Sequence, residues 1–314
     1  MSRMDTQPDL SLIIVSWNVA ALLEACLRSI YANAGSLALE VIVVDSASTD
    51  DSVARVQAAY PQVRLLTQTE NIGFTRGNNI GLDAARGRLI MLLNPDTEIV
   101  ANALPTLARY LDEHPAVGIV GPHTLNSDGT TQPTKRRFPT LRTGIFESTC
   151  LQRYAPRRML DRFYTNDIPP DATAEVDWMQ GSALMFRHEV YHQVGALDER
   201  YVMYSEEVDF CKRAKDRGWQ VVYLGAARIV HHGGQSTAQA NARSHIHFQQ
   251  SKLVYFRKHH GRRAAGILRA VIILNYVWQL AEEWLKGILG SKRELRRERV
   301  RVYRQVLRSL VRTV

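Results

Sequence analysis

Several features that mark particular protein classes are scarce in this sequence. It has only three cysteines, Cys26, Cys150 and Cys211, and no CxxC pair. We therefore expect free thiols in a reducing compartment, not disulfides or zinc ligands. The first ten residues lack an apolar core, so we expect no secretory signal. The chain contains no internal repeat or low-complexity linker, and its average composition predicts a globular fold.

Two common phosphate-binding loops are also missing. No G-x-G-x-x-G follows the first predicted strand, and no G-x-x-x-x-G-K-[ST] occurs, which disfavours dehydrogenases and ATPases. A nucleotidyltransferase would normally carry a basic, glycine-rich loop after that strand, but the segment IIVSWNVAALLEA has none.

The first hundred residues alternate between two kinds of pattern. Apolar, β-branched runs at 10–17, 39–45, 63–68 and 88–94 are separated by helical stretches. This order predicts an α/β fold with a mostly parallel central sheet flanked by helices, which binds ligands at the carboxyl ends of its strands. The other predicted elements are a strand at 116–122, loops and short helices over 123–172, a strand–turn–strand at 175–188, a helix at 206–217, and strands at 219–225 and 227–232.

Positive charge is concentrated near the C-terminus. From Arg257 onward there are 15 Lys and Arg against four Glu, a net charge of +11, which leaves −2 for the first 256 residues. An enzyme that acts on nucleic acid would usually be basic around its site, so we expect no nucleic-acid partner.

The basic region contains an apolar stripe at alternating spacings of four and three residues, the pattern of an amphipathic helix. Its members are Ile267, Val271, Leu274, Trp278, Ala281, Leu285 and Ile288. The longest uncharged run has 12 residues, against the roughly 20 that a spanning helix needs, so we expect no crossing of a bilayer. The helix suits an anionic membrane surface. The alternative is packing on its own domain or on a dimer partner.

Polar side chains follow the predicted strands. Asp45 could accept a hydrogen bond from a pyrimidine or a ribose, or it could form an Asx-turn or helix cap. The loop at 71–79 combines two glycines, three Asn and the phosphate-suited fork of Arg76, although a turn with a helix cap is the alternative. Asp96, in Asn94-Pro95-Asp96, follows a buried strand and suits a divalent cation carried with a diphosphate, or a helix cap.

Two further clusters lie in the second half. Glu206, Glu207 and Asp209 begin a predicted helix. Acids there favour the helix dipole, each by about 0.3–1 kcal/mol, and Ser205 could cap. Three acids nevertheless exceed what capping needs, and their repulsion would raise at least one pKa toward the range of a general base. His231 and His232 could supply a neutral imidazole to a metal, or they could be structural.

Taken in order, these motifs resemble family 2 glycosyltransferases, which are inverting, nucleotide-sugar-dependent enzymes with a GT-A fold. The resemblance is strongest to bacterial rhamnosyltransferases of cell-surface polysaccharide synthesis, and it spans about residues 10–240. The matching motifs are IIVSWN, VIVVDSASTDDS, NIGFTRGNNIGL, LLNPDT, VDWMQGSALMFRHEV, LDERYVMYSEEVDFCKRAKDRGW and VHHGGQS.

The resemblance implies a role for each matching position. The nucleotide-sugar site would comprise Ser16, Asn18, Asp45, Asn71, Gly73, Arg76, Asn79 and Asn94. Mg²⁺ or Mn²⁺ would be bound by Asp96 with His231, or less readily with His232. Glu207 would be the catalytic base, supported by Glu206 and Asp209. The acceptor or the diphosphate would be faced by Trp178, Gln180 and Gly181.

The resemblance also implies an organisation and a reaction. The parts would be an N-terminal tail (1–9), a nucleotide-sugar-binding half (10–122), an acceptor-binding and catalytic half (123–256) and a basic amphipathic helical tail (257–314). The enzyme would move a sugar to a glycan or polyprenyl-diphosphate-linked glycan, at the inner face of the cytoplasmic membrane, as a peripheral cytoplasmic protein. The favoured donor is deoxythymidine diphosphate L-rhamnose. UDP- or GDP-sugars, a non-catalytic binding module and a homo-oligomer stay open.

Overall fold

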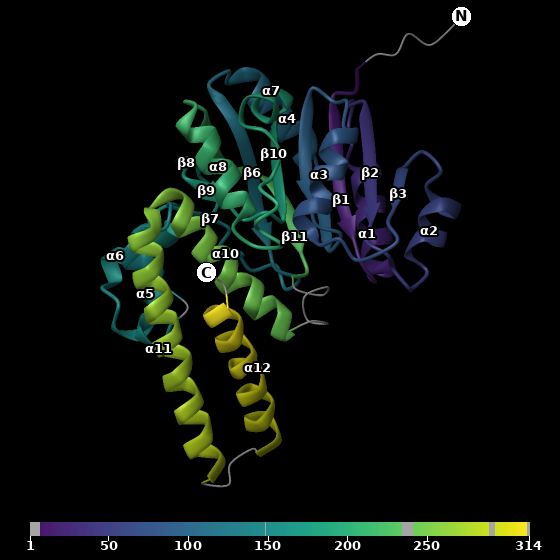
Figure 1. Ribbon diagram of the computed structural model, residues 1–314. Helices are drawn as coiled ribbons and strands as arrows, with labels where there is room; N and C mark the ends of the chain where they lie inside the picture. The colour runs from purple at the N-terminus through teal and green to yellow at the C-terminus, as the bar shows by residue number, and fades with distance from the viewer. Residues whose placement is uncertain (1–6, 148, 234–240, 289–292, 313–314) are drawn as a thin grey trace, which may run out of the picture. The chain divides into compact units, whose positions relative to one another are not determined.

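A computed structural model describes residues 7–147, 149–233, 241–288 and 293–312. The eleven strands are β1 (Leu10–Ser16), β2 (Leu39–Asp45), β3 (Arg64–Thr67), β4 (Leu89–Leu93), β5 (Thr97–Val100), β6 (Val117–Leu125), β7 (Lys135–Arg136), β8 (Thr173–Val176), β9 (Trp178–Met179), β10 (Ala183–Arg187) and β11 (Gln220–His231). Figure 1 shows the strands of the main sheet side by side, with helices packed against them.

The helices are α1 (Ala20–Ala32), α2 (Ser52–Ala59), α3 (Phe74–Ala84), α4 (Ala103–Glu113), α5 (Leu141–Phe146), α6 (Arg157–Tyr164), α7 (His188–Val194), α8 (Glu206–Asp216), α10 (Asn241–His259), α11 (Gly261–Ile288) and α12 (Arg293–Arg312). A short 3₁₀ helix, η1, spans Cys150–Tyr154.

The main sheet has nine strands in the order β3-β2-β1-β4-β10-β6-β11-β5, with β8 paired to β11. β1 to β4, β6 and β11 run in one direction, whereas β10, β5 and β8 run antiparallel to their neighbours. The parallel ends of β1 and β2 meet at the pair Ser16 and Asp45. The sheet therefore brings together the polar residues that follow these strands.

Both faces of this sheet are apolar, which explains the near-continuous hydrophobic strands. Alternate residues such as Leu12 and Ile14 face α1, α2 and α4. The intervening residues, such as Ile13 and Val15, face α3, α7 and α8. α3 approaches β1 closely, because a Cβ on Gly81 would lie only 2.2 Å from Cγ2 of Ile13.

Most predicted strands and helices appear where the sequence indicates them. The prediction of two strands at 219–225 and 227–232 corresponds to one strand, β11, with a register shift between Leu224 and Arg228. β5 and α4 had no counterpart in the sequence analysis. Pro105 breaks the helical pattern of α4, but it lies in the first turn, where proline is tolerated.

The chain divides into two compact units. The first holds the nine-stranded sheet and comprises residues 1–138, 164–199 and 206–236. The second, here called the helical unit, comprises residues 139–163, 200–205 and 237–314. These bounds differ from the predicted divisions at 122 and 256, because two earlier segments join the C-terminal helices.

The helical unit has its own buried interior. α10, α11 and α12 pack on one another, and α11 also packs on α5. Phe256 from α10, Leu268 and Ile272 from α11, and Val306 and Leu310 from α12 are buried. This burial uses a different side of α11 from the stripe that the sequence singled out.

That predicted stripe lies largely on the outer side of α11. Ile267, Leu274, Trp278, Leu285 and Ile288 are each at least half exposed. Among the residues that the structure describes, most of this stripe is therefore not buried within its own domain. α11 has 28 residues and is, by length and composition alone, long and apolar enough to cross a membrane. The shortness of its uncharged run, 12 residues, therefore does not by itself exclude that α11 spans a membrane.

Candidate active site

The ends of β1 and β2 present two buried polar groups. One oxygen of Asp45, Oδ2, accepts a hydrogen bond from the Ser48 amide at 2.9 Å, which is the predicted turn. Its other oxygen, Oδ1, and the Ser16 hydroxyl are buried without a hydrogen-bond partner in the described residues. Since a buried polar atom is seldom left unsatisfied, this pair is suited to donors and acceptors of a ligand.

Two of the predicted asparagines hold the neighbouring loops. The Asn18 Oδ1 accepts a hydrogen bond from the Thr49 amide at 2.7 Å. The Asn71 Oδ1 accepts from the Ser46 hydroxyl at 3.2 Å and from the Gly73 amide at 3.0 Å. These contacts shape the loops after β1, β2 and β3, and a direct role for Asn18 and Asn71 in nucleotide binding stays a prediction.

The loop before α3 contains the other predicted donor-side residues. Gly73 has φ = +78°, a left-handed conformation that favours glycine. Arg76 is exposed on the first turn of α3 and has no ion pair in the described residues. The Asn79 amide donates to the Leu197 carbonyl at 2.9 Å and accepts from the Leu197 amide at 3.0 Å. Asn79 therefore anchors the segment that leads toward α8.

Asp96 and His231 lie together beyond β4. The His231 Nε2 is 3.3 Å from the Asp96 Oδ1 and 3.3 Å from the Asn94 Nδ2. The His231 Nδ1 is 2.7 Å from the Gln132 Oε1, whose amide nitrogen donates to Asn126. The Gln132 Oε1 can only accept a hydrogen bond, so it suits an N–H group at Nδ1 and holds the ring with Nε2 facing Asp96.

This arrangement fits a divalent cation. The donors are a buried carboxylate, an oriented imidazole and the Asn94 Oδ1, which is buried without a hydrogen-bond partner in the described residues. Mg²⁺ and Mn²⁺ accept such ligands, with phosphate oxygens completing the shell. The described residues contain no group of three or more His, Cys, Asp or Glu side chains arranged as ligands, so a substrate would supply the rest.

The neighbouring His232 points elsewhere. Its Nε2 is 2.8 Å from the Glu98 Oε1, and its Nδ1 is 2.8 Å from the Ser127 hydroxyl. Successive side chains of a strand leave on opposite sides, which separates His231 from His232. Of the two predicted ligands, the geometry favours His231.

Glu207 and the backbone of Asn94 contact the same turn, formed by Gly181 and Ser182. The Asn94 amide donates to the Ser182 carbonyl at 2.9 Å. A Cβ built on Gly181 would lie 3.6 Å from the Glu207 Cβ and 3.9 Å from its carboxyl carbon. The end of β4 and the start of α8 are therefore joined through two consecutive residues.

The two adjacent glutamates differ in environment. Glu206 is buried, whereas Glu207 is partly exposed. Burial, and then the neighbouring charge of Glu207, raises the pKa of Glu206 well above its ordinary value. The predicted repulsion within the acidic cluster therefore acts on Glu206, whose pKa it helps to raise.

The third acid, Asp209, stabilises the position of α8. It is fully buried, and its Oδ2 accepts from the Arg213 Nε at 2.8 Å. The Arg213 guanidinium also donates to the Ala196 carbonyl at 2.9 Å. Asp209 thus supports the base candidate through the position of the helix.

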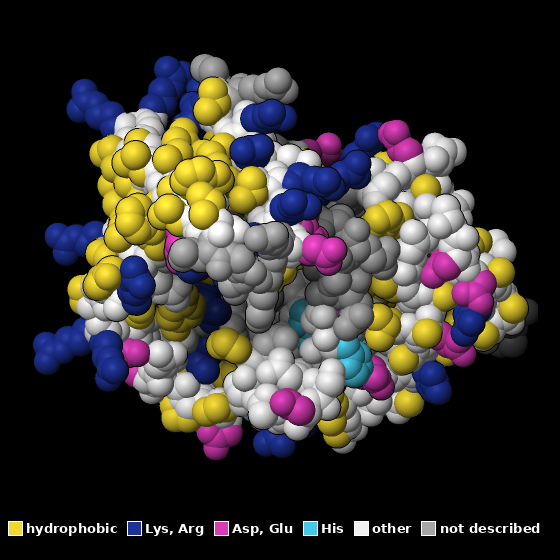
Figure 2. Space-filling view, turned by 90° about the horizontal axis from the view of Figure 1, so that it is seen from below, with side chains coloured by type: hydrophobic (Ala, Val, Ile, Leu, Met, Phe, Trp, Pro, Cys, Tyr) yellow, Lys and Arg dark blue, Asp and Glu magenta, His cyan; other side chains and the backbone are white. Residues whose placement is uncertain are grey.

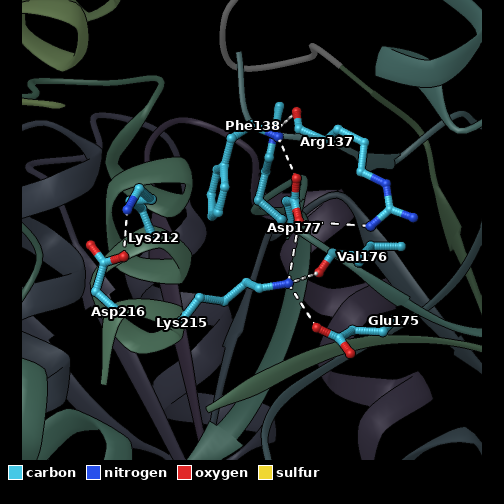
Figure 3. Close-up of polar contacts among 9 residues, drawn as sticks. Arg137, Phe138, Glu175, Val176, Asp177, Lys212, Lys215 and Asp216 are labelled. Carbon is cyan, nitrogen blue, oxygen red and sulfur yellow. Dashed lines mark hydrogen bonds and ion pairs between the residues drawn. The ribbon is translucent and has the colours of Figure 1, made fainter. Parts of the chain in front are cut away.

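The other end of α8 is tied to the sheet, as Figure 3 shows. The Lys215 ammonium donates to Glu175 at 2.8 Å, to the Val176 carbonyl at 3.1 Å and to Asp177 at 3.2 Å. Asp177 in turn accepts from the Phe138 amide at 2.9 Å. The last turn of the helix that carries Glu207, which contains Arg213 and Lys215, is therefore anchored within the first unit.

The residues directly before α8 belong to the helical unit. Tyr204 and Ser205 have φ values of +70° and +68°, which non-glycine residues rarely adopt. The Ser251 hydroxyl of α10 donates to the Met203 carbonyl at 2.8 Å, and the Phe248 ring packs edge-on against Tyr204. Strain of this kind persists only where surrounding contacts fix it.

The comparison with protein families decides the assignment. The model of Glycosyl transferase family 2 matches residues 11–177, more than half of the chain. This chain belongs to glycosyltransferase family 2. The predicted family is thus confirmed.

Individual relatives agree with this assignment. The chain is 29% identical over 270 residues to the N-acetylglucosaminyl-diphospho-decaprenol L-rhamnosyltransferase of Mycobacterium tuberculosis, covering 80% of this chain and 85% of that protein. It is also 29% identical over 226 residues to the low-salt glycan biosynthesis hexosyltransferase Agl10 of Haloferax volcanii, covering 71% of this chain and 66% of that protein.

Solved structures support the fold. A mannosyltransferase of Pyrobaculum calidifontis, solved with GDP-Man and Mn²⁺, superposes with a TM-score of 0.56 at 17% identity, covering 98% of this chain and 87% of that one. GalNAc-T7, solved with UDP, GalNAc and Mn²⁺, gives 0.55 at 14% identity over 72% of this chain and 43% of that one. The predicted GT-A fold is confirmed.

In this family 2 glycosyltransferase, the predicted acceptor-side residues occupy different environments. The Trp178 indole donates to the Arg137 carbonyl at 2.9 Å. Gln180 is exposed, and its backbone amide donates to the Thr134 carbonyl at 2.9 Å. Only Gly181 adjoins Glu207 in the described contacts. Contact of these three residues with an acceptor stays a prediction.

Two contributors to the site were not predicted from the sequence. Gln132 orients His231 across 99 positions of sequence, and Ser182 supplies the carbonyl that holds Asn94. Gln132 lies in a segment with weak periodicity, so only the pairing of β6 with β11 reveals its partner.

Proposed function

We propose that this family 2 glycosyltransferase transfers a sugar, with inversion, from a nucleoside diphosphate sugar to a polyprenyl-diphosphate-linked glycan in cell-surface polysaccharide synthesis. The observation that carries the proposal is the Gly181–Ser182 turn, which binds the Asn94 backbone and adjoins Glu207. Similarity to the mycobacterial rhamnosyltransferase favours L-rhamnose, so deoxythymidine diphosphate L-rhamnose is the first donor to test, before UDP- and GDP-sugars.

On the donor side, Asp45 and Ser16 would bind the nucleoside, and Asp96 with His231 would hold Mg²⁺ or Mn²⁺ at the diphosphate. The bound cation would neutralise negative charge on the departing diphosphate. The exposed guanidinium of Arg76 would add a bidentate contact to the same group. Gln132 keeps the His231 ring in the orientation that this site requires.

On the acceptor side, Glu207 would act as the general base. The acceptor oxygen forms a bond to the anomeric carbon while the bond from that carbon to the diphosphate oxygen breaks. The electron pair of the broken bond leaves with the diphosphate, and the hydroxyl proton passes to Glu207. The raised pKa of Glu206 disfavours a second negative charge beside the base.

The proposed place of action is the cytoplasmic face of the membrane, as a peripheral protein. A polyprenyl-linked acceptor resides in a bilayer, and the exposed apolar stripe of α11 beside the basic α12 suits contact with an anionic surface.

The substitution Glu207→Gln tests the base. We expect transfer to fall by at least about 10²-fold, while donor affinity measured by calorimetry stays within about threefold. Product formation is followed by mass spectrometry with deoxythymidine diphosphate L-rhamnose and a short polyprenyl-diphosphate acceptor. Glu206→Gln is the matched control and should lose far less activity, because the raised pKa of Glu206 favours the neutral carboxyl group that glutamine resembles. Near-normal turnover of Glu207→Gln would exclude Glu207 and leave a non-catalytic binding module as the better interpretation.

The substitution Asp96→Ala tests the metal site. We expect the affinity for the nucleotide sugar in Mn²⁺ to fall at least about tenfold, to the level that the unchanged enzyme shows in EDTA, because the one negatively charged ligand among the proposed protein donors is lost. His232→Ala is the control, since its side chain pairs with Glu98. Equal donor affinity with and without EDTA would refute a metal-bridged diphosphate.

A further inference from the structure

The helical unit contains a basic groove that no step of the proposed reaction uses. It lies between α11 and α12 and has a volume of about 690 Å³. One side is formed by Trp284 and Ile288 of α11, and the other by arginines of α12. Among the described residues that line it, Glu283 is the only acidic one.

Four of these arginines form one face of α12. Arg297, Arg301, Arg304 and Arg308 follow one another at spacings of four, three and four residues, so they share a side of the helix. The buried Val306 and Leu310 occupy another side. The groove face of α12 is therefore a ladder of guanidinium groups.

The acidic residue in the groove is already neutralised. Arg296 and Arg299 both form ion pairs with Glu283. Burial alone would raise the pKa of Glu283, but these two arginines hold it below its ordinary value. Within the described part of the chain, the four arginines of the ladder have no ion pair of their own. Their charge is available to an external anion.

The groove adjoins an exposed apolar surface. Trp284 and Ile288 are 63% and 60% exposed, and along the same helix Leu274 and Trp278 are 68% and 60% exposed. Figure 2 shows hydrophobic side chains gathered into a field that is bordered by Lys and Arg. Monomeric soluble proteins rarely expose such an apolar field without a function.

We propose that the groove between α11 and α12 binds the phosphate headgroups of anionic phospholipids, while the outer face of α11 enters the acyl region of the same leaflet. Guanidinium groups bind phosphate oxygens bidentately, and exposed Trp side chains suit the membrane interface. A phospholipid carries both a phosphate, which the arginines would bind, and acyl chains, which the outer face of α11 would contact. The site is separate from Glu207 and Asp96, and its test does not depend on glycosyl transfer.

The test uses flotation of the full-length protein with vesicles. We expect binding to vesicles of phosphatidylcholine with 30% phosphatidylglycerol, and at least tenfold weaker binding to phosphatidylcholine alone. Arg301→Gln with Arg304→Gln should weaken binding at least tenfold. Arg262→Gln with Arg263→Gln removes the same charge from exposed positions that do not line the groove, and it should weaken binding less than threefold. Circular dichroism checks the folding of each variant.

Several outcomes would overturn the proposal. Equal losses in the two double variants would mean that net charge alone matters, and unchanged binding of the Arg301 and Arg304 variant would remove the groove from the role. Binding that requires polyprenyl diphosphate in the vesicles would assign the groove to the acceptor instead. Binding that survives 1 M salt would indicate that α11 crosses the bilayer. If none of these outcomes occurs, and inorganic phosphate at constant ionic strength releases the protein from the vesicles, the result supports a headgroup site.

Discussion

At the scale of single residues, adjacent acids in one helical turn have separate tasks. Glu206 is buried and has a raised pKa, Glu207 reaches the Gly181 turn, and Asp209 is bound by Arg213. The side chains differ because successive positions of a helix point in different directions, about 100° apart. A cluster that looks uniform in the sequence thus becomes three distinct environments.

The raised pKa of Glu206 predicts a pH dependence of stability. Above about pH 4.5, the ordinary pKa, the unfolded chain has lost this proton while the folded chain keeps it. The free energy of unfolding should therefore fall as pH rises above 4.5, until the folded-state pKa is reached, by at most about 1.4 kcal/mol per pH unit.

Glu206→Gln removes this contribution. Urea denaturation at pH 4 to 8 should show the wild-type protein losing stability relative to Glu206→Gln as pH rises. Groups that do not interact with Glu206 cancel in that difference, whereas the titration of Glu207 is coupled to it. A difference between the two proteins that does not change with pH would contradict a raised pKa of Glu206.

At the scale of elements, α8 determines the position of Glu207. The last turn of this helix is fixed by Lys215 on the segment Glu175–Asp177 (Figure 3) and by Arg213 on the Ala196 carbonyl, and Asp209 in the first turn pairs with Arg213. Both attachments use charged groups with partial burial, where hydrogen bonds contribute more than at the open surface.

Lys215→Met should lower the free energy of unfolding by about 1–3 kcal/mol, because three hydrogen bonds are lost and Asp177 loses a charged partner. Lys212→Met is the matched control on the same helix. Its pair with Asp216 is an i,i+4 contact with an exposed partner, and such pairs contribute about 0.5 kcal/mol or less. Urea denaturation measures both, and equal effects would show that the Lys215 network does not anchor α8.

At the scale of the whole molecule, the chain enters the helical unit three times, at 139–163, 200–205 and 237–314. Residues 139–163 are held there by α10 and α11. The Cys150 amide donates to the Asn275 Oδ1 at 2.8 Å, and the Lys252 ammonium pairs with Glu147. The unit is therefore more than a C-terminal appendage.

Asn275→Ala should make residues 139–163 more sensitive to limited proteolysis, because the Cys150 amide would lose its buried acceptor at a cost of about 1–3 kcal/mol. Gln279→Ala, one turn further along α11, is the control. Mass spectrometry of the first cleavage products identifies the site. Cleavage that is equally rapid in the two variants would mean that Asn275 does not hold this segment.

The sequence by itself determined the main features of the sheet, because both-sided burial requires nearly continuous apolar strands such as 10–16 and 39–45. It also indicated Asp96 and Glu207, since polar residues after buried strands and acids at a helix start are local patterns. The period of the α11 stripe predicted a helix correctly, but periodicity states only that a face is apolar.

Which side of α11 packs inside the helical unit was decided by tertiary structure alone. Leu268, Ile272 and Tyr276 are buried there, and the stripe lies outside. The same holds for the choice between His231 and His232, which depends on the direction of each side chain from β11 and on Gln132 from a distant segment. Both outcomes depend on contacts between residues far apart in the chain, and local sequence patterns do not predict such contacts.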